Sequence, residues 1–358
     1  MQVLQPGTGL TESCSYLPAE PERVLWGRLP CAADEPVLTI DSHSALVIDT
    51  LSHEGILEDQ GRDPVRYFGA HGVDPDQVLT DAIELARSRH PRDPALDGPH
   101  VCTGPVFVNG AEPGDLLKMT VQETTPRVPY GVISNRHGRG ALAGEYPLAA
   151  GPVSVFTPVQ TDDQGRLVGR LPLTPGGDRT VSFALRPFLG IMGVAVRGDV
   201  RPHSVPPGSH GGNLDINLLT TGASLYLPVQ VPGALAYVGD PHFAQGDGEV
   251  ALTALEASLR VTLDFEVVPR AAAVAAFGEL VGPLAQTTDF LVPTGLDPDL
   301  DAAVQKCVRA AIALLQARYG MDPTLAYAYL SAATDFNISQ VVDLVQGVHA
   351  RIRTADFG

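Results

Sequence analysis

The segment "GDPHFAQGDGEV", residues 239–250, gathers carboxylates and a histidine that together could bind a cation. Alternate residues of an extended chain project to the same face, so Asp240 and His242 are expected to lie side by side. A turn over "QGDGE" would bring Glu249 back towards them. A carboxylate beside an imidazole is ligand chemistry for zinc or a similar divalent ion, which would lower the pKa of a bound water. The structural alternative is a polar turn whose aspartates cap backbone amides.

Four further stretches place histidines and carboxylates beside glycines or at the ends of expected strands. The first holds His210, Asn213 and Asp215, the second His100, the third Asn135, His137 and Glu145, and the fourth Asp49, His53 and Glu54. The paired glycines Gly211 and Gly212 would let the backbone approach a ligand closely. The structural alternatives are, in the same order, a glycine turn, a core histidine, a solvated loop and a helix cap.

Several nucleophile and nucleotide motifs are missing from the sequence. It contains no GxSxG elbow, no Walker A loop and no GxGxxG run, which argues against an α/β-hydrolase triad and against nucleotide binding. Cys102 follows His100 by two residues, so a cysteine–histidine pair on one strand face is conceivable.

The composition favours a β-rich protein and excludes some partners. Of 358 residues, 44% are hydrophobic, enough for a large core, and 37 glycines with 31 prolines favour short strands joined by tight turns. The net charge of −17 would repel phosphate backbones and anionic lipid, so we predict no nucleic-acid and no membrane partner. The four cysteines are scattered and the N-terminus has no basic start or apolar run, which predicts a reducing, cytoplasmic location.

Local patterns predict strands through most of the chain and helices near its end. The strands are expected within residues 35–50, 106–123, 152–185, 223–240 and 259–268. A short helix within residues 74–90 lies in a polar insert at about 52–98. Aspartate-rich starts and a closing glycine predict two helices, at 297–320 and 322–336, that form a hairpin.

The expected fold class is therefore mainly β, with a β-sandwich or barrel-like core and a smaller α+β part that includes the C-terminal helical hairpin. We expect a mainly β unit over residues 1–200, with the helical insert, and a β-rich unit over 201–358 that carries the segment at 239–250. The two units are expected to intertwine. Prolines at expected sheet edges and the helical hairpin offer apolar surfaces, which predicts a homo-oligomer.

Several motifs together resemble the acetamidase/formamidase family. They are "TGPVFVNGAEPGDLL", "HGGNLDI", "LYLPVQVPGA", "GDPHFAQGDGEV" with the later "TALE", and "AYAYLSAATDFNISQVV". They occur in the family's order between about residue 37 and residue 350, so the resemblance covers nearly the whole chain. It implies a β-rich, sandwich-like fold, a bound divalent metal, and hydrolysis of a short aliphatic amide such as formamide or acetamide to a carboxylate and ammonia.

With this resemblance, each candidate residue is given an expected role. The expected metal ligands are Asp240 and His242, helped by His100 and by Asp49 or Asp215. Zinc is expected first, because calcium prefers an all-oxygen shell. Glu145 or Glu249 is expected to move the proton, and the Gly211–Gly212 amides or the Asn213 side chain to stabilise the oxyanion. The residues expected to bind the amide substrate are His53, His137, His210 and Gln245.

One stretch departs from the family and leaves the substrate and the reaction open. Family members usually carry a tryptophan-containing segment where this chain has "LSHEGILEDQGRDPVRYFGAHGVDPDQVL" at residues 51–79. That difference favours a larger amide, an imide or a carbamate as the alternative substrate. Two further functions remain compatible with the residues: a hydrolase that uses Glu145 or Cys102 directly without a metal, and a non-catalytic protein that binds a small ligand.

Overall fold

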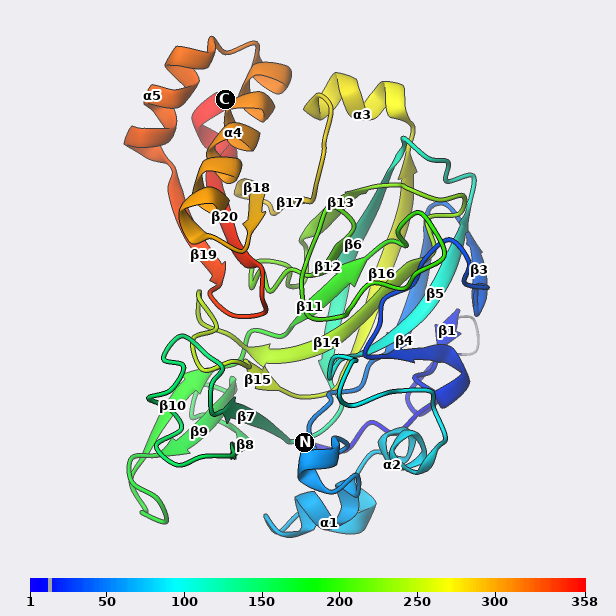
Figure 1. Cartoon of the computed structure of the whole chain (residues 1–358), viewed down its shortest axis with the longest axis vertical. Helices are drawn as coiled ribbons and strands as arrows, with labels where there is room; N and C mark the ends of the chain where they lie inside the picture. Colours follow the sequence, from blue (N-terminus) through cyan, green and yellow to red (C-terminus); the bar gives the residue numbers. More distant parts are fainter. Residues whose placement is uncertain (12–14) are drawn as a thin grey trace.

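The computed structural model describes residues 1–11 and 15–358 and has two large β-sheets, which confirms the mainly β prediction (Figure 1). The nine-stranded sheet runs in the order β1 (Tyr16–Leu17), β4 (Ser44–Asp49), β16 (Leu259–Val268), β6 (Leu116–Pro126), β13 (Ser224–Pro228), β17 (Leu284–Gln286), β18 (Phe290–Asp297), β20 (Gln346–Arg353) and β19 (Asp335–Gln340).

The eleven-stranded sheet begins with a protruding arm and ends near the middle of the molecule. Its order is β10 (Thr180–Ala184), β9 (Leu167–Pro172), β8 (Pro152–Thr161), β7 (Tyr130–Arg136), β15 (Leu255–Glu256), β14 (Ala236–Ala244), β11 (Phe188–Gly193) and β12 (Gly211–Asn213). Beside this path, β5 (Val101–Asn109) pairs with β14, and β2 (Val24–Trp26) and β3 (Leu38–Asp41) pair with β5. The two predicted hairpins of residues 152–185 are therefore β8–β9–β10.

The main core lies between the two sheets. One cluster of buried apolar side chains contains Val121 and Leu263 from the nine-stranded sheet and Val132 and Val238 from the eleven-stranded sheet. Strand β16 shows the alternation that the sequence predicted, since its residues 259, 261, 263 and 265 are all buried. Both sheets draw strands from either side of residue 200, so the sheets do not divide the chain there.

The helices lie at two ends of the molecule. In the insert, α1 (Pro64–Gly69) and α2 (Thr80–Arg87) follow the short 3-10 turns η2 (Glu58–Gln60) and η3 (Pro75–Gln77). Two more 3-10 turns, η1 (Pro21–Arg23) and η4 (Thr354–Phe357), lie near the chain ends. The helix in this insert begins later than predicted, because a 3-10 turn occupies the "DPD" segment.

The predicted C-terminal hairpin is present as α4 (Leu300–Tyr319) and α5 (Pro323–Ala333). Asp299 caps α4 at its start and Gly320, with φ 63°, ends it, while Asp322 caps α5. These helices cover β18 and β20 over a second apolar cluster, together with α3 (Arg270–Phe277), a helix that the local sequence patterns did not predict (Figure 1).

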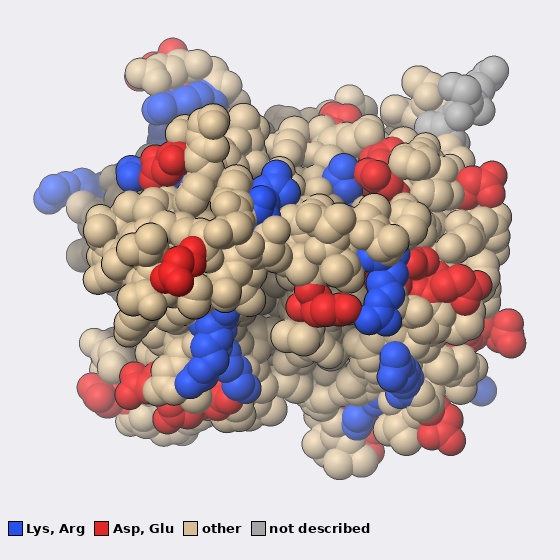
Figure 2. Space-filling view, turned by 90° about the horizontal axis from the view of Figure 1, so that it is seen from above, with Lys and Arg blue, Asp and Glu red and all other residues tan. Residues whose placement is uncertain are grey.

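Charged side chains of both signs are mixed on the face of the molecule seen from above in Figure 2. On the face that Figure 2 shows, basic and acidic side chains are interspersed among the described residues without a large area of one sign. Within residues 1–11 and 15–358, no helix combines the length and the hydropathy that crossing a bilayer requires.

Candidate active site

Strands β14 and β15 bring the first candidate ligands together. Asp240 and His242 lie on β14 and project to one face, as their spacing predicted, and His242 is paired in register with Glu256 on β15. The Nε2 atom of His242 lies 3.1 Å from Asp240 Oδ2 and 3.0 Å from Glu256 Oε1. A bulge follows His242 in β14, where the ladder ends and the chain turns into the glycine-rich segment.

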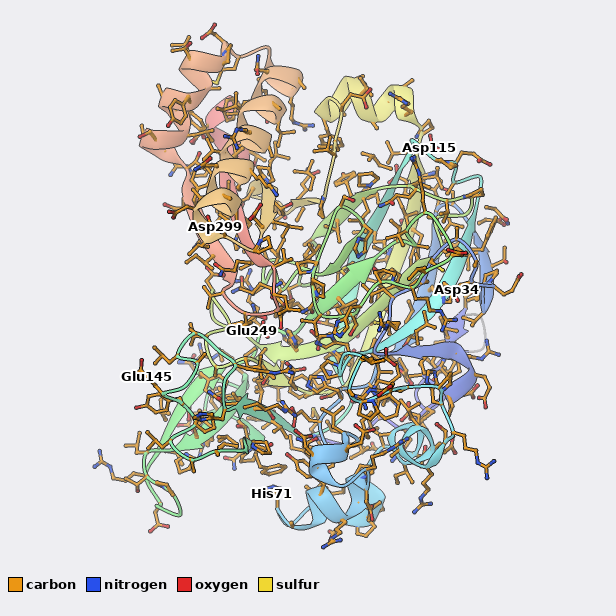
Figure 3. The ribbon with its side chains drawn as sticks, viewed as in Figure 1. Asp34, His71, Asp115, Glu145, Glu249 and Asp299 are labelled. Carbon is orange, nitrogen blue, oxygen red and sulfur yellow. The ribbon has the colours of Figure 1, made fainter. Side chains whose placement is uncertain are left out.

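That turn returns a further carboxylate to the same place. Ligand atoms of Asp215, His242 and Glu249 all lie within 4.8 Å of one another. Asp215 follows β12, and its Oδ1 lies 3.8 Å from Nδ1 of His242. Figure 3 places Glu249 near the middle of the molecule, and the neighbouring Gly248 forms a bridge with Gln340 at the end of β19.

Two histidines complete the group from the opposite side. His53 Nδ1 lies 3.8 Å from Asp240 Oδ1 and 3.9 Å from Glu256 Oε2. His100 Nε2 also lies 3.8 Å from Asp240 Oδ1. We refer to the seven residues as the histidine–carboxylate cluster: His53, His100, Asp215, Asp240, His242, Glu249 and Glu256. All seven are buried.

Many polar atoms of this cluster have no hydrogen-bond partner among the described residues. They are both ring nitrogens of His53 and His242, both carboxylate oxygens of Asp215, and one oxygen each of Asp240, Glu249 and Glu256. Buried polar groups without partners cost free energy, and buried charges cost more. Orphaned nitrogen and oxygen atoms that converge in this way fit the mixed donor set of a divalent metal site.

A glycine makes room beneath the cluster. Gly190 lies in β11, and a Cβ atom built on it would lie 2.5 Å from Asp240 Oδ2, 2.6 Å from Asp215 Oδ1 and 2.7 Å from Cε1 of His242. Such distances are far inside van der Waals contact. The absence of a side chain at position 190 is therefore a requirement of this arrangement.

Three of the carboxylates sit on a backbone conformation that L-residues rarely adopt. The φ angles are 50° at Asp215, 51° at Asp240 and 47° at Glu249. Non-glycine residues with positive φ cost conformational energy and gather at functional sites. The surrounding strands thus hold these side chains in a geometry that the isolated segments would not favour.

Burial and mutual charge shift the protonation equilibria of the cluster. Burial lowers the pKa of His100 to about 4 although the Asp240 carboxylate opposes it. Burial also raises the pKa of Glu249 well above its ordinary value, and the neighbouring Asp215 carboxylate adds to this shift. The pKa of His242 rises because Glu256 and Asp240 outweigh the effect of its burial. Perturbed groups in a cleft are typical of functional sites.

The cluster forms part of the wall of a cavity of ≈ 740 Å³. Cluster residues that line it are His53, His100, Asp240, Glu249 and Glu256. Asn213, expected to stabilise an oxyanion, also lines it, and its Nδ2 donates to Asp343 Oδ2 at 2.9 Å. The neighbouring Gly211–Gly212 pair is buried in β12 and does not line the cavity.

The loop that follows β7 leaves two candidate residues away from the cavity. Glu145 is exposed, and Figure 3 shows it well to the side of Glu249. His137 directs its Nδ1 to the carbonyl of Pro147 at 3.3 Å. Neither residue lines the cavity, so their expected roles as base and substrate ligand find no support in their positions.

Gln245 and His210 do not face the cavity. Gln245 Nε2 donates to the carbonyl oxygens of Asp215 at 2.9 Å and Ser339 at 3.2 Å, so it fixes the backbone around the cluster. Two backbone hydrogen bonds join the same segments: the amide of Gly248 donates to the carbonyl of Ser339, and the amide of Val341 donates to the carbonyl of Gly248. The ring of His210 is buried beside Gly208, and burial lowers its pKa to about 4. Neither side chain lines the cavity.

Asp49, expected to help bind the metal, lies outside the cluster. Its two oxygens accept from Arg260 at 2.6 and 2.8 Å, and Oδ2 also accepts from Tyr16 at 2.7 Å. The fully buried Arg127 lies 3.4 Å from Asp49 and bonds Asp81 at 2.8 Å. Asp49 therefore neutralises buried arginines, and a cation next to it would be repelled.

Replacing Asp49 with asparagine is expected to lower the free energy of unfolding by about 3–5 kcal/mol, since it leaves buried arginines without their counter-charge. Urea unfolding measures the effect, and Asp163→Asn, at an exposed turn, serves as the matched control. A metal held by the histidine–carboxylate cluster would be unaffected by this change, because Asp49 lies outside that cluster. Loss of metal with unaltered stability would contradict this assignment.

Sequence reasoning gave no role to three residues that the structure brings to the site. Glu256 belongs to the "TALE" motif, and its contact with His242 depends on the β14–β15 register. Glu54 lies 3.4 Å from His53 Nε2 and accepts from Ser134 Oγ at 2.6 Å, so it can orient that imidazole. Asp343 arrives from the β19–β20 connection.

The sequence matches one protein-family model and is similar to curated proteins with related names. The model of the Acetamidase/Formamidase family matches residues 81–203 and 198–353. An acetamidase of Mycolicibacterium smegmatis is 30% identical over 207 residues, which are 44% of this chain and 51% of that protein. A formamidase of Methylophilus methylotrophus is 30% identical over 200 residues, 44% of this chain and 49% of the relative. The chain thus spans about half the length of the curated relatives it matches.

A solved structure extends the similarity of fold over nearly the whole chain. The crystal structure of an acetamidase from Yersinia enterocolitica superposes with a TM-score of 0.75 at 23% identity. The match covers 99% of this chain and 96% of the other.

Proposed function

Since the chain belongs to the acetamidase/formamidase family, we propose that it is a hydrolase that cleaves the C–N bond of an aliphatic amide and releases ammonia. The observation that carries the proposal is the histidine–carboxylate cluster, whose unpartnered buried atoms meet at the wall of a cavity. A protein that only bound a small ligand would have no need for so many ionisable groups at one place.

We propose that a divalent metal belongs to this cluster, with zinc the first expectation for a mixed set of nitrogen and oxygen ligands. Asp240 and His242 would hold it, and further ligands would come from Glu256, His53, His100 or Asp215. When bound, such a cation would supply Lewis-acid polarisation of the amide carbonyl and lower the pKa of a water molecule.

The chain's own residues would then position the substrate and move the proton. Glu249 lines the cavity beside the cluster and would accept a proton from the attacking water and return it to the leaving nitrogen. The Asn213 side chain, held by Asp343, would steady the oxygen of the tetrahedral intermediate. A C–O bond forms, the C–N bond breaks, and the products are a carboxylate and ammonia.

Removal of bound metal is expected to abolish ammonia release from acetamide and larger aliphatic amides, and added zinc is expected to restore it. The measurement is an ammonia assay on protein that has been dialysed against a chelator, with elemental analysis of each sample. Full activity in protein shown to be free of metal would sink the metal-dependent version of the proposal.

A mechanism in which Cys102 acts as a nucleophile without a metal has a physical obstacle. Cys102 is fully buried on β5, and burial raises the pKa of its thiol well above the ordinary value. A thiol that stays protonated at neutral pH is a poor nucleophile. Treatment with a thiol-blocking reagent should therefore leave ammonia release intact.

The proposal also keeps the predictions about cellular context. A cytoplasmic location, association into homo-oligomers, and the absence of nucleic-acid and membrane partners are carried forward as predictions from composition.

A further inference from the structure

The cavity beside the cluster is larger than a formamide or acetamide molecule requires. Its volume of ≈ 740 Å³ lies in the range of pockets that hold drug-sized ligands, about 300–1,000 Å³. Apolar side chains form much of the wall beyond the cluster: Leu57, Leu96, Val205, Leu252, Val342 and Leu344. A substrate that filled this space would carry an apolar segment beyond its amide group.

Three carboxylates of the outer wall are already neutralised by arginines. Asp59 accepts from Arg136 at 2.8 Å, and Asp97 accepts from Arg28 at 2.6 Å. Glu58 pairs with Arg92, which also lines the cavity. Each of these acids therefore has its own arginine, and none of them needs a further cation.

Arg139 is the exception among the arginines that line the cavity. Within residues 1–11 and 15–358, its guanidinium forms no hydrogen bond and no ion pair. Its neighbour Arg136 also retains a buried Nη2 atom without a partner. Among the described residues, Arg139 is thus a guanidinium of the cavity wall without a carboxylate partner, and it can donate several N–H bonds in a planar fork.

The backbone of the loop that carries the exposed Arg139 is tied to the segment of Glu249. The glycines on either side of it have positive φ, 83° at Gly138 and 84° at Gly140, which shape the loop. Two residues on, the amide of Ala141 donates to the carbonyl of Val250 at 2.9 Å, directly after Glu249. The loop that bears Arg139 is therefore tied to the same segment that carries Glu249 into the site.

The cavity wall holds an imidazole outside the cluster, that of His203. Burial lowers the pKa of His203, and the positive charges of Arg28 and Arg139 add to this shift while Asp97 opposes it. His203 lines the same cavity. An anionic group bound in this cavity would have both a guanidinium and an imidazole in the wall around it.

We propose that the substrate is an amide with an apolar spacer and a terminal carboxylate, and that Arg139 is the residue that selects it by binding that carboxylate at the mouth of the cavity. The inference rests on the proposed amide hydrolysis. The reaction then consumes an ω-carboxy amide and water and yields a dicarboxylate and ammonia, with the carboxylate end unchanged.

A matched pair of substrates tests this selectivity. The monoamide of glutaric acid carries the carboxylate, and 5-methylhexanamide replaces it with an isopropyl group on the same chain. We expect the wild-type protein to favour the anionic amide in kcat/KM by about tenfold or more, as for a charged hydrogen-bonded pair. In Arg139→Gln the ratio of the two kcat/KM values should fall to near one, and Arg139→Lys should retain part of it.

The control is Arg179→Gln, which removes the same charge from an exposed loop outside the cavity and should leave the ratio unchanged. A wild-type preference for the neutral amide would overturn the inference. So would an Arg139→Gln variant whose two kcat/KM values fall equally or whose ratio is unaltered.

A binding measurement separates this inference from the proposed function. Glutarate, the expected product, is titrated calorimetrically into the wild-type protein and both glutamine variants. Binding that is weaker by about tenfold in Arg139→Gln, and in no other variant, supports the carboxylate site. If glutarate binds in this way but no amide is hydrolysed, only the proposed function fails. Equal binding by all three proteins overturns the carboxylate site.

Discussion

Replacing His242 with alanine is expected to reduce kcat/KM for amide hydrolysis by about a thousandfold or more, because the metal's contribution of several kcal/mol would be lost. Its ring contacts Asp240 and Glu256 through one nitrogen and approaches Asp215 through the other. Its contacts with Asp240 and Glu256, at 3.1 and 3.0 Å, are shorter than any that His53 or His100 makes with a carboxylate of the cluster. Ammonia release and bound metal are the two quantities to measure.

The matched control is His71→Ala, which removes a histidine near α1, far from the cluster in Figure 3. Circular dichroism should give the same spectrum for both variants, since the cluster lies at the end of a strand pair that the sheets hold in place. If His242→Ala kept its metal and turned over amide at the wild-type rate, the assignment of the cluster as the active site would be wrong.

Replacing Gly190 with alanine is expected to lower bound metal and activity by about a hundredfold, although it adds a single methyl group. That methyl would overlap oxygens of Asp240 and Asp215 and the His242 ring, so the cluster would have to open. Overpacking of this kind costs about 1–3 kcal/mol, and a misplaced catalytic group costs about a hundredfold in rate. Elemental analysis and the ammonia assay report the two effects.

Gly246→Ala is the control for this substitution. A Cβ atom at Gly246 meets no atom within 4 Å, and the residue lies in the same glycine-rich segment. It should therefore keep metal and activity. A Gly190→Ala variant with a full complement of metal and unaltered turnover would show that the close contacts can relax without consequence.

Local sequence patterns predicted the parts of the site that depend on local geometry. The alternation of Asp240 and His242 follows from the two-residue period of a strand, and the return of Glu249 follows from a glycine-rich turn. In the same way, the capped helices α4 and α5 and the β8–β9–β10 hairpins were readable from short stretches.

What the sequence could not supply were partners distant along the chain. Asp49 was assigned to the metal because it ends a strand beside a histidine, but its charge is taken by Arg260, 211 positions away. Glu256 joins the cluster through strand pairing with His242, which no local pattern specifies. Glu145 lay within a family-like glycine segment, but only the path of its loop shows that it is exposed.

The order of strands across the two sheets was equally beyond local patterns. Strand β6 pairs with β13 and β16, and β14 pairs with β5 and β11, so each sheet joins segments from distant parts of the chain. Such pairings are decided by packing of the common core between the sheets and not by the propensity of any one strand.

The hydrogen bonds between the β19 end and the glycine-rich segment have a consequence for biosynthesis. Residues 339–341 hold Gly248, Gln245 and Asn213 through hydrogen bonds. They are synthesised after the rest of the cavity wall, apart from its lining residues at 341–346. Nascent chains that lack these residues can form much of the sandwich while the wall near Glu249 still lacks its support. The wall near Glu249 therefore gains its support only after residues 339–341 have been synthesised and have paired with the earlier segments.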